Sequence, residues 1–246
     1  MATTQADEHT RVLAAVDVGT NSVHVVVARV HGEGALAQFE VLTREKEMVR
    51  LGSGAGDMKE LSSDAIDRAV AALRRCRSIA DGADAALRVV ATSAVREAEN
   101  RDVLIDRARE EAGVAIEVIS GSEEARLIHL GVLRSVPATE QSMVIVDIGG
   151  GSTEIVLSDG PRLRVGRSLK LGSIRMTSRF FGGKRLHPGA VDACRRHVRA
   201  TLIPFLRAAA GDHGVVVVGR SGTIEALATV EHTRLNGSVP RSVANV

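Results

Sequence analysis

Val16-Asp-Val-Gly-Thr-Asn-Ser22 and Val146-Asp-Ile-Gly-Gly-Gly-Ser152 are two versions of one pattern, repeated at an offset of 130 residues. In each, an apolar run ends in an aspartate, a glycine-bearing turn follows, and a second apolar run begins. Glycine has no Cβ, so the backbone of such a turn can approach a ligand closely. Consecutive N–H groups and hydroxyls in the turn form a concavity that suits an anion such as phosphate. Two unrelated β-turns, which also favour Asp, Gly and Asn, are the weaker interpretation.

The residues around the two turns predict strands and helices in α/β order. Apolar runs indicate strands at 13–16, 23–30, 36–43, 87–91, 114–119, 143–146, 154–157, 162–168 and 215–218. Capping residues and helical spacing predict helices from Ser62 or Ser63, from Asn100 to Gly113, from Ser122 to about Arg134, from Pro188 to a kink or end at Pro204, and from Ile224. We therefore expect two α/β domains that face each other across a cleft, 1–134 and 135–246.

The charge of the chain changes sign along its length. The net charge is +2, but residues 1–160 carry 17 Lys+Arg against 26 Asp+Glu, whereas residues 161–210 carry 12 Lys+Arg and one acid, Asp192. Such a basic block attracts polyanions, although it can also be a solvated face rich in arginine. The chain has no Trp, no Tyr and four Phe. Stacking aromatics, which single-stranded nucleic acids require, are therefore scarce, and we expect no nucleic acid polymer as a partner.

Several function classes are excluded by missing motifs. The sequence has no Gly-x₄-Gly-Lys-Ser/Thr loop, no His-Glu-x-x-His pair and no Gly-x-Ser-x-Gly elbow. The glycines at 52–56 fit no nucleotide fingerprint and predict a flexible loop. Cys76 and Cys194 lack metal-ligand spacing and should be reduced thiols, and His24 and His129 should be packed. No apolar run reaches the roughly 18–20 residues that span a bilayer, and no signal peptide is evident, so we expect a cytoplasmic protein without a membrane partner.

Polar residues follow other predicted strands as well. The carboxyl ends of strands face the ligand crevice in α/β folds, so Thr92, Ser93 and Arg96 are candidate phosphate contacts, with a surface arginine as the alternative for the last. Segment 220–223, Arg-Ser-Gly-Thr, holds the equivalent position in the second half. Its threonine is also a candidate helix N-cap.

Two carboxylates lie in the first turn of the helix predicted from Ser122. The helix macrodipole keeps Glu123 and Glu124 ionised there. A charged carboxylate beside a phosphate site can deprotonate a water, although acidic residues are ordinary in a first helical turn. Asp17 and Asp147, at the ends of strands, offer the hard oxygen ligands that Mg²⁺ prefers.

Five stretches, in this order, resemble the exopolyphosphatase / guanosine pentaphosphate phosphohydrolase (Ppx/GppA) family. They are Ala15-Val-Asp-Val-Gly-Thr-Asn-Ser22, Ala91-Thr-Ser-Ala-Val-Arg-Glu-Ala98, Val118-Ile-Ser-Gly-Ser-Glu-Glu-Ala-Arg-Leu127, Val146-Asp-Ile-Gly-Gly-Gly-Ser-Thr-Glu154 and Ser221-Gly-Thr223. The resemblance implies an actin-like fold (the fold of sugar kinases, Hsp70 and actin), with two RNase-H-like domains around a phosphate-binding cleft. It also implies Mg²⁺-dependent release of the terminal phosphate of inorganic polyphosphate, or of the 5′ γ-phosphate of guanosine pentaphosphate (pppGpp).

The resemblance carries roles over by position. Glu124 matches the catalytic glutamate that activates the attacking water. The metal-site residues implied are Asp147, Asp17 and Glu154. The phosphate-binding residues implied are Asp17, Gly19, Thr20, Asn21, Ser22, Thr92, Ser93, Arg96, Gly149, Gly150, Gly151, Ser152, Thr153, Ser221, Gly222 and Thr223.

The chain departs from the family pattern at two places. Arg220 replaces the small residue that usually precedes Ser-Gly-Thr, and could contact phosphate or crowd the nucleoside side of the cleft. Family members continue beyond the position of Val246, so the second domain is expected to be incomplete. Polyphosphate is the favoured substrate, because a long polyanion matches the basic block. The alternatives are pppGpp hydrolysis, an ATP-using kinase on the same fold, and a non-catalytic regulator that binds polyphosphate or an alarmone. The oligomeric state considered is a homodimer.

Overall fold

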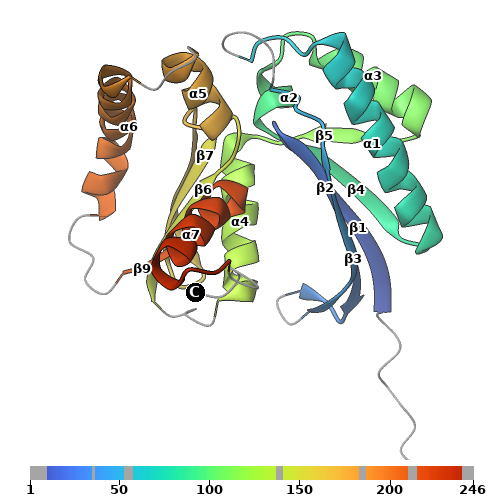
Figure 1. Cartoon of the computed structure of the whole chain (residues 1–246). Helices are drawn as coiled ribbons and strands as arrows, with labels where there is room; N and C mark the ends of the chain where they lie inside the picture. Colours follow the sequence, from blue (N-terminus) through green and yellow to red (C-terminus); the bar gives the residue numbers. More distant parts are fainter. Residues whose placement is uncertain are drawn as a thin grey trace, which may run out of the picture. The chain divides into compact units, whose positions relative to one another are not determined.

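The computed structural model of the chain describes residues 10–34, 37–52, 58–136, 141–182, 187–209 and 215–239 (Figure 1). These residues form two compact units, one comprising those up to Ile119 and the other those from Ser120 onward. No helix in the described parts is long and apolar enough to cross a membrane.

The first unit is a five-stranded sheet covered by helices. Its strands are β1 (Thr10–Val18), β2 (Ser22–His31), β3 (Gln38–Met48), β4 (Ala86–Ala91) and β5 (Ile116–Val118), in the order β3-β2-β1-β4-β5. The first three are antiparallel neighbours, whereas β4 and β5 run parallel to β1. Its helices are α1 (Ser63–Gly82), α2 (Ser93–Glu97) and α3 (Arg101–Ala112).

Local signals explain where these helices begin and end. The Ser62 hydroxyl accepts a hydrogen bond from Ala65 N at 3.3 Å, which confirms the predicted N-cap of α1. Gly113 ends α3 in the left-handed region, at φ 62°, where glycine is favoured. Asn100 precedes α3 but does not cap it with its side chain, which instead exchanges hydrogen bonds with both backbone groups of Leu61.

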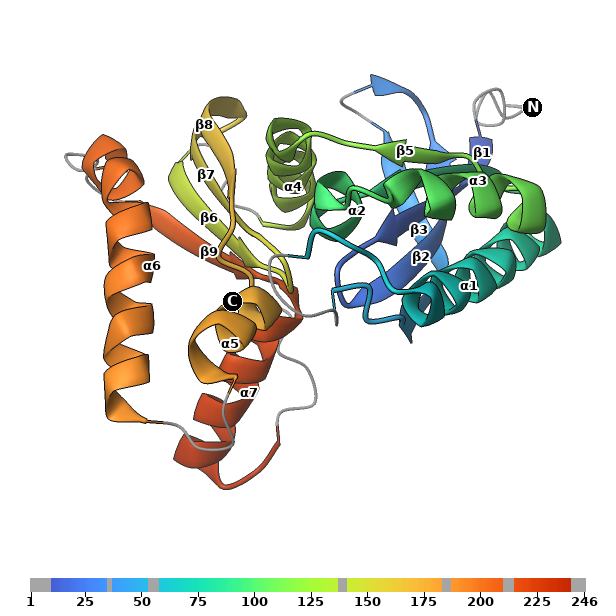
Figure 2. The same cartoon turned by 90° about the horizontal axis from the view of Figure 1, so that it is seen from above.

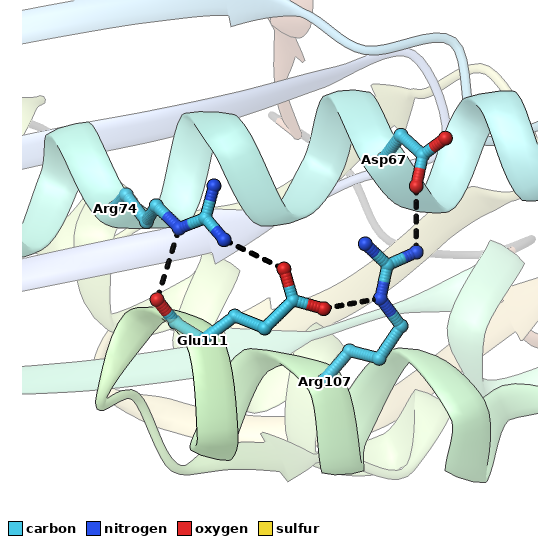
Figure 3. Close-up of polar contacts among 4 residues, drawn as sticks. All are labelled: Asp67, Arg74, Arg107 and Glu111. Carbon is cyan, nitrogen blue, oxygen red and sulfur yellow. Dashed lines mark hydrogen bonds and ion pairs between the residues drawn. The ribbon is translucent and has the colours of Figure 1, made fainter.

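The core of the first unit lies between the sheet and the helices α1 and α3. Buried valines of β1 and β2 pack against buried alanine and leucine side chains of the two helices. A polar network also joins the helices (Figure 3): Arg107 bonds to Asp67 and Glu111, and Arg74 bonds to Glu111, at 2.5–2.6 Å. The hydrogen bond from Arg107 lowers the pKa of Glu111. Because these groups remain partly exposed, the apolar contacts supply most of the stability.

The second unit repeats this topology. Its strands are β6 (Ser142–Ile148), β7 (Thr153–Asp159), β8 (Arg162–Leu169) and β9 (Val216–Arg220), in the order β8-β7-β6-β9. Strands β6 to β8 are antiparallel neighbours, and β9 runs parallel to β6. This matches β3-β2-β1-β4, so the repeat inferred from the two turns extends to the sheets (Figure 2). Its helices are α4 (Gly121–Ser135), α5 (Ser173–Phe181), α6 (Pro188–Ala209) and α7 (Ser221–Asn236).

Helix α4 belongs to the second unit, which differs from the predicted boundary at 134/135. Ala125, Ile128 and Val132 of α4 form one apolar cluster with residues of β6 and β7, including Met143 and Ile145. The proline after the helix is a local break signal, but packing places the division of the chain before the helix, at 119/120.

Two helix starts differ from their predictions, and of the kink or end predicted at Pro204 the end is excluded. The N-cap of α4 is Ser120 and not Ser122, because the Ser120 hydroxyl accepts from Glu123 N at 3.1 Å. Pro204 lies inside α6, which continues to Ala209. Helix α7 begins at Ser221, so Thr223 is not its cap. Helix α5 was not predicted, because its N-cap, Gly172, has no side chain to indicate a helix start.

Candidate functional site

The first turn is fixed through its carbonyl groups. Gly19 N donates to Ser22 O at 3.0 Å, which closes the turn between β1 and β2. The carbonyl of Thr20 accepts from the backbone of segment 49–52 at 2.9 Å, and that of Asn21 accepts twice, at 2.9 and 3.0 Å. The stretch that follows β3 therefore holds both carbonyls on one side of the turn.

The second turn is fixed in the same way. Gly149 N donates to Ser152 O, again at 3.0 Å. Backbone N–H groups of segment 172–175 donate to the carbonyls of Gly149 and Gly150 at 2.9–3.2 Å, and the side chain of Arg175 donates to Gly151 O at 2.8 Å. This segment follows β8, just as segment 49–52 follows β3.

The N–H and C=O groups of a peptide unit point in opposite directions. Because the carbonyls of each turn face the segment that binds them, the N–H groups of the same peptide units face away from that segment. Within the parts of the chain that the structure describes, the amides of Thr20, Asn21, Gly150 and Gly151 donate to no acceptor. Two of these residues are buried and two half-buried, and backbone donors in such positions are costly to leave unpaired. Two such donors in succession form a concavity for an anion. The predicted phosphate turns therefore have a geometry suited to phosphate in both units.

The predicted residues that follow β4 lie beside the first turn. Thr92 N donates to Val18 O at 3.2 Å, next to the turn. Thr92 and Ser93 are buried, and the Ser93 hydroxyl donates to Glu97. The Arg96 guanidinium donates to the carbonyl of Ile119 at 3.0 Å. Thr92 thus bonds to the residue that precedes the turn, whereas Ser93 bonds within α2 and Arg96 bonds to the stretch that follows β5.

The residues that follow β9 lie beside the second turn. The Ser221 hydroxyl donates to Ile148 O at 2.6 Å, and the Thr223 hydroxyl approaches that of Ser173 at 3.5 Å. Ser221 has φ 76°, a value that non-glycine residues rarely adopt. Strain of this kind is concentrated at functional sites. Segment 221–223 is thus held against the turn by side-chain hydrogen bonds.

Asp147, Glu154 and Arg220 lie opposite one another on neighbouring strands. Asp147 of β6 pairs in register with Glu154 of β7 on one side and with Arg220 of β9 on the other. Arg220 Nε is 3.8 Å from Asp147 Oδ2. Burial raises the pKa of Asp147, while Arg220 and Ser221 act in the opposite direction. Arg220 therefore contacts a candidate metal ligand, which neither interpretation of this residue from the sequence anticipated.

Glu124 lies in the first turn of α4, near the same strands. A Cβ built on Gly121 would lie 2.6 Å from Ser168 Cβ, so this turn packs directly on β8. The Ser168 hydroxyl donates to the carboxylate of Glu154, which is only 2% exposed, at 2.6 Å. Glu124 is half-buried, and its neighbour Glu123 forms an ion pair with Arg126 at 2.7 Å. The candidate site of the second unit thus has carboxylates on three elements, β6, β7 and α4. In the described ranges, however, no three His, Cys, Asp or Glu side chains lie close enough together to hold a metal ion by themselves.

Asp17 lies in the first unit. It is the penultimate residue of β1, where it is exposed and pairs in register with His24. His129 is buried, and its Nε2 contacts Gly160 O at 3.2 Å, as expected for a packed histidine.

The segments that hold the two turns were not predicted from the sequence. A Cβ on Gly52 would lie 2.3 Å from Thr20 Cγ2, and one on Gly172 would lie 2.3 Å from Gly150 O. Both glycines are therefore needed so that the segment can approach its turn. A signal was present, because Leu-Gly-Ser occurs at 51–53 and again at 171–173. The loop predicted at 52–56 is fixed at Gly52, and its other residues lie outside the described ranges.

Two α/β units of this topology, each with a phosphate-type turn after its first strand, define the actin-like class of proteins. Within that class the chain belongs to the Ppx/GppA phosphatase family, whose model matches residues 25–242.

Solved structures agree with this placement. An exopolyphosphatase from Cytophaga hutchinsonii ATCC 33406 is similar over 94% of this chain and 73% of its own, with 28% identity and a TM-score of 0.83. The Aquifex aeolicus PPX-GPPA enzyme is similar over 92% of this chain and 72% of its own, with 27% identity and a TM-score of 0.73. The type IV pilus biogenesis complex PilM–PilN shares the fold alone, at 15% identity and a TM-score of 0.53 over 91% of this chain and 85% of that one.

Proposed function

We propose that this protein is a hydrolase that releases the terminal phosphate of inorganic polyphosphate. The observation that carries the proposal is the pair of turns whose carbonyls are held and in which two successive amides donate to no acceptor among the described residues. Terminal phosphates are the anions that such donors suit. Membership of a phosphatase family and the likeness to an exopolyphosphatase support hydrolysis as the reaction.

The residues present fit a role for Mg²⁺. This ion keeps several waters and binds through one or two carboxylates together with substrate phosphates, so it needs no cage of three protein ligands. Asp147 is the best candidate, because its side chain is 14% exposed beside the second turn. Glu154 is nearly inaccessible and would support it from the neighbouring strand. In the first unit, Asp17 is the candidate ligand beside that unit's own turn. When bound, Mg²⁺ would neutralise charge on the phosphates.

We assign the activation of water to Glu124. Its backbone N donates to the carbonyl of the N-cap residue, Ser120, so it lies where the helix dipole favours an ionised carboxylate. As a general base, Glu124 would take a proton from water as the water oxygen bonds to the terminal phosphorus. The bridging P–O bond then breaks, and the shortened chain leaves with its electron pair.

Polyphosphate is favoured over pppGpp because a long polyanion can contact the basic block at 161–210 beyond the turns. We propose a cytoplasmic location for the enzyme. We also propose that it is a homodimer, and light scattering would test this by measuring the molar mass in solution.

The test is a phosphate-release assay with medium-chain polyphosphate, pppGpp and ATP in parallel, with and without Mg²⁺. Replacement of a general base lowers the rate by about 10²–10⁴-fold, so we expect that loss for Glu124→Gln. Glu123→Gln is the matched control, because it removes a neighbouring carboxylate that is already paired with Arg126. An unchanged rate for Glu124→Gln would overturn the assignment. Transfer of phosphate to a sugar or acid would indicate a kinase, and ligand binding without turnover would indicate a regulator.

A further inference from the structure

A basic cavity of about 630 Å³ in the second unit is left unused by the proposed reaction. It lies among the end of β8, α5 and α6. Its lining residues are Lys170, Leu171, Arg175, Ser178, Arg179, His197 and Thr201. Every charged lining side chain is basic, and two of the other residues offer hydroxyls.

Two of the basic side chains, Arg179 and His197, contact each other and Phe180 beside the cavity. Arg179 Nη1 lies 3.5 Å from His197 Nε2, and the Arg179 guanidinium lies 5.4 Å from the ring centroid of Phe180. The rings of Phe180 and His197 are 5.6 Å apart. The Thr201 hydroxyl donates to the carbonyl of His197 one helical turn earlier. Because these contacts fix the donors in advance, an anion that binds them loses less affinity to side-chain ordering.

The cavity lies on the carbonyl side of the second turn. Arg175 lines the cavity and donates to Gly151 O, and Leu171 lines it and accepts from the Thr153 hydroxyl. The unpaired N–H groups of the turn lie on its other side. An anion in the cavity would therefore not compete with a phosphate on the turn.

We propose that this cavity is a second anion-binding site, which holds phosphate groups of a polyphosphate chain away from the terminal one. The choice of polyphosphate as the ligand rests on the proposed function. The inference that the cavity binds an anion depends only on its basic lining residues. Its volume is within the range of about 300–1,000 Å³ that is usual for ligand sites. Phe180 is half-buried, and Arg179 lies over one face of its ring, which disfavours stacking of a nucleic acid base there.

The test compares Arg179→Ala with Arg196→Ala, which removes the same charge from an exposed site on α6 outside the cavity. Binding of medium-chain polyphosphate and of tripolyphosphate to the full chain is measured by calorimetry without Mg²⁺. A hydrogen bond to a charged group contributes about 1.5–3 kcal/mol, so Arg179→Ala should weaken binding of the long chain at least about tenfold. Arg196→Ala should weaken it less than about twofold, because Arg196 does not line the cavity and its exposed charge is screened by salt.

Equal effects of the two substitutions would overturn the inference. Tighter binding of a single-stranded oligonucleotide than of polyphosphate of equal charge, lost in Arg179→Ala, would also overturn it and assign the cavity to nucleic acid. The outcome is separate from that of the hydrolase proposal, because affinity is measured without turnover. If the unaltered protein releases no phosphate but Arg179→Ala still loses affinity, the hydrolase proposal fails and the cavity site stands. If phosphate is released and Arg179→Ala binds normally, only the cavity site fails.

Discussion

Replacing Gly172 by alanine is the most direct test of how the second turn is held. Gly172 is the N-cap of α5, and its N–H approaches Gly151 O at 3.4 Å. The new methyl group would lie 2.3 Å from Gly150 O and 2.3 Å from Gly151 C. Both contacted atoms are backbone, so no side chain can rotate away.

The expected cost follows from this overlap. Ordinary van der Waals contact begins at 3.4 Å, so either the turn or the start of α5 has to move by about an ångström. Over-packing in a well-packed site costs about 1–3 kcal/mol, and we expect the upper end because the backbone has to shift. For a chain of this size that corresponds to a fall in Tm of roughly 6–12 °C. A displacement of this size at a reacting group can lower a rate about a hundredfold.

Thermal unfolding by circular dichroism and the phosphate-release assay measure the two effects. Gly131→Ala is the control in the same unit. Gly131 lies inside α4, where a new Cβ would meet only Arg220 Nη1, at an ordinary 3.8 Å. Since alanine is favoured over glycine in a helix by about 1 kcal/mol, this variant should be slightly more stable than the original. If Gly172→Ala unfolds and reacts like the unaltered protein, segment 172–175 does not fix the turn and the reasoning is wrong.

Two further predictions concern ionisable groups. Burial raises the pKa of Asp147 above its ordinary value of 3.8, so the stability from this group is full at low pH and is lost as pH rises through the folded pKa. In the Asp147→Asn variant the Tm should therefore fall less as the pH rises. A Tm that falls with pH as steeply as in the unaltered protein would contradict this prediction. Burial also raises the pKa of Cys76 to about 11, so that roughly one thiol in a thousand is ionised at pH 8. In a Cys194→Ser background a thiol reagent should label Cys76 only after denaturation, and rapid labelling of the folded protein would contradict this.

The turns could be predicted from sequence because their signals are local. An aspartate, a glycine and hydroxyl residues within seven positions are enough to indicate a tight turn between strands, and the second copy strengthens the case. The full strand order was not predicted, because the parallel pairing of β4 with β1 and of β9 with β6 joins strands that are distant in the sequence. Gly113 was equally readable, since a glycine after a helical run commonly adopts the left-handed conformation found there.

The remaining features depend on contacts between distant residues. Gly52 lies 32 residues after Thr20, and their contact exists only once β3 has paired with β2 in the observed register. The contact of Arg220 with Asp147 likewise depends on the register of β9 against β6. Ser120 and Ser122 are both suitable N-caps by composition, and only the structure shows that Ser120 accepts the hydrogen bond from Glu123 N. No single window of sequence contains these determinants.

The way the turns are held also sets an order for their formation during synthesis. Each turn is translated well before the stretch that binds its carbonyls, by about thirty residues in the first unit and about twenty in the second. Until the third strand of a sheet has left the ribosome and paired, the carbonyls have no internal donors, and the turn backbone is free to sample other conformations. A nascent chain that already contains every residue of a turn therefore cannot yet present a preorganised anion site. Binding competence arises separately in each half, when its third strand docks.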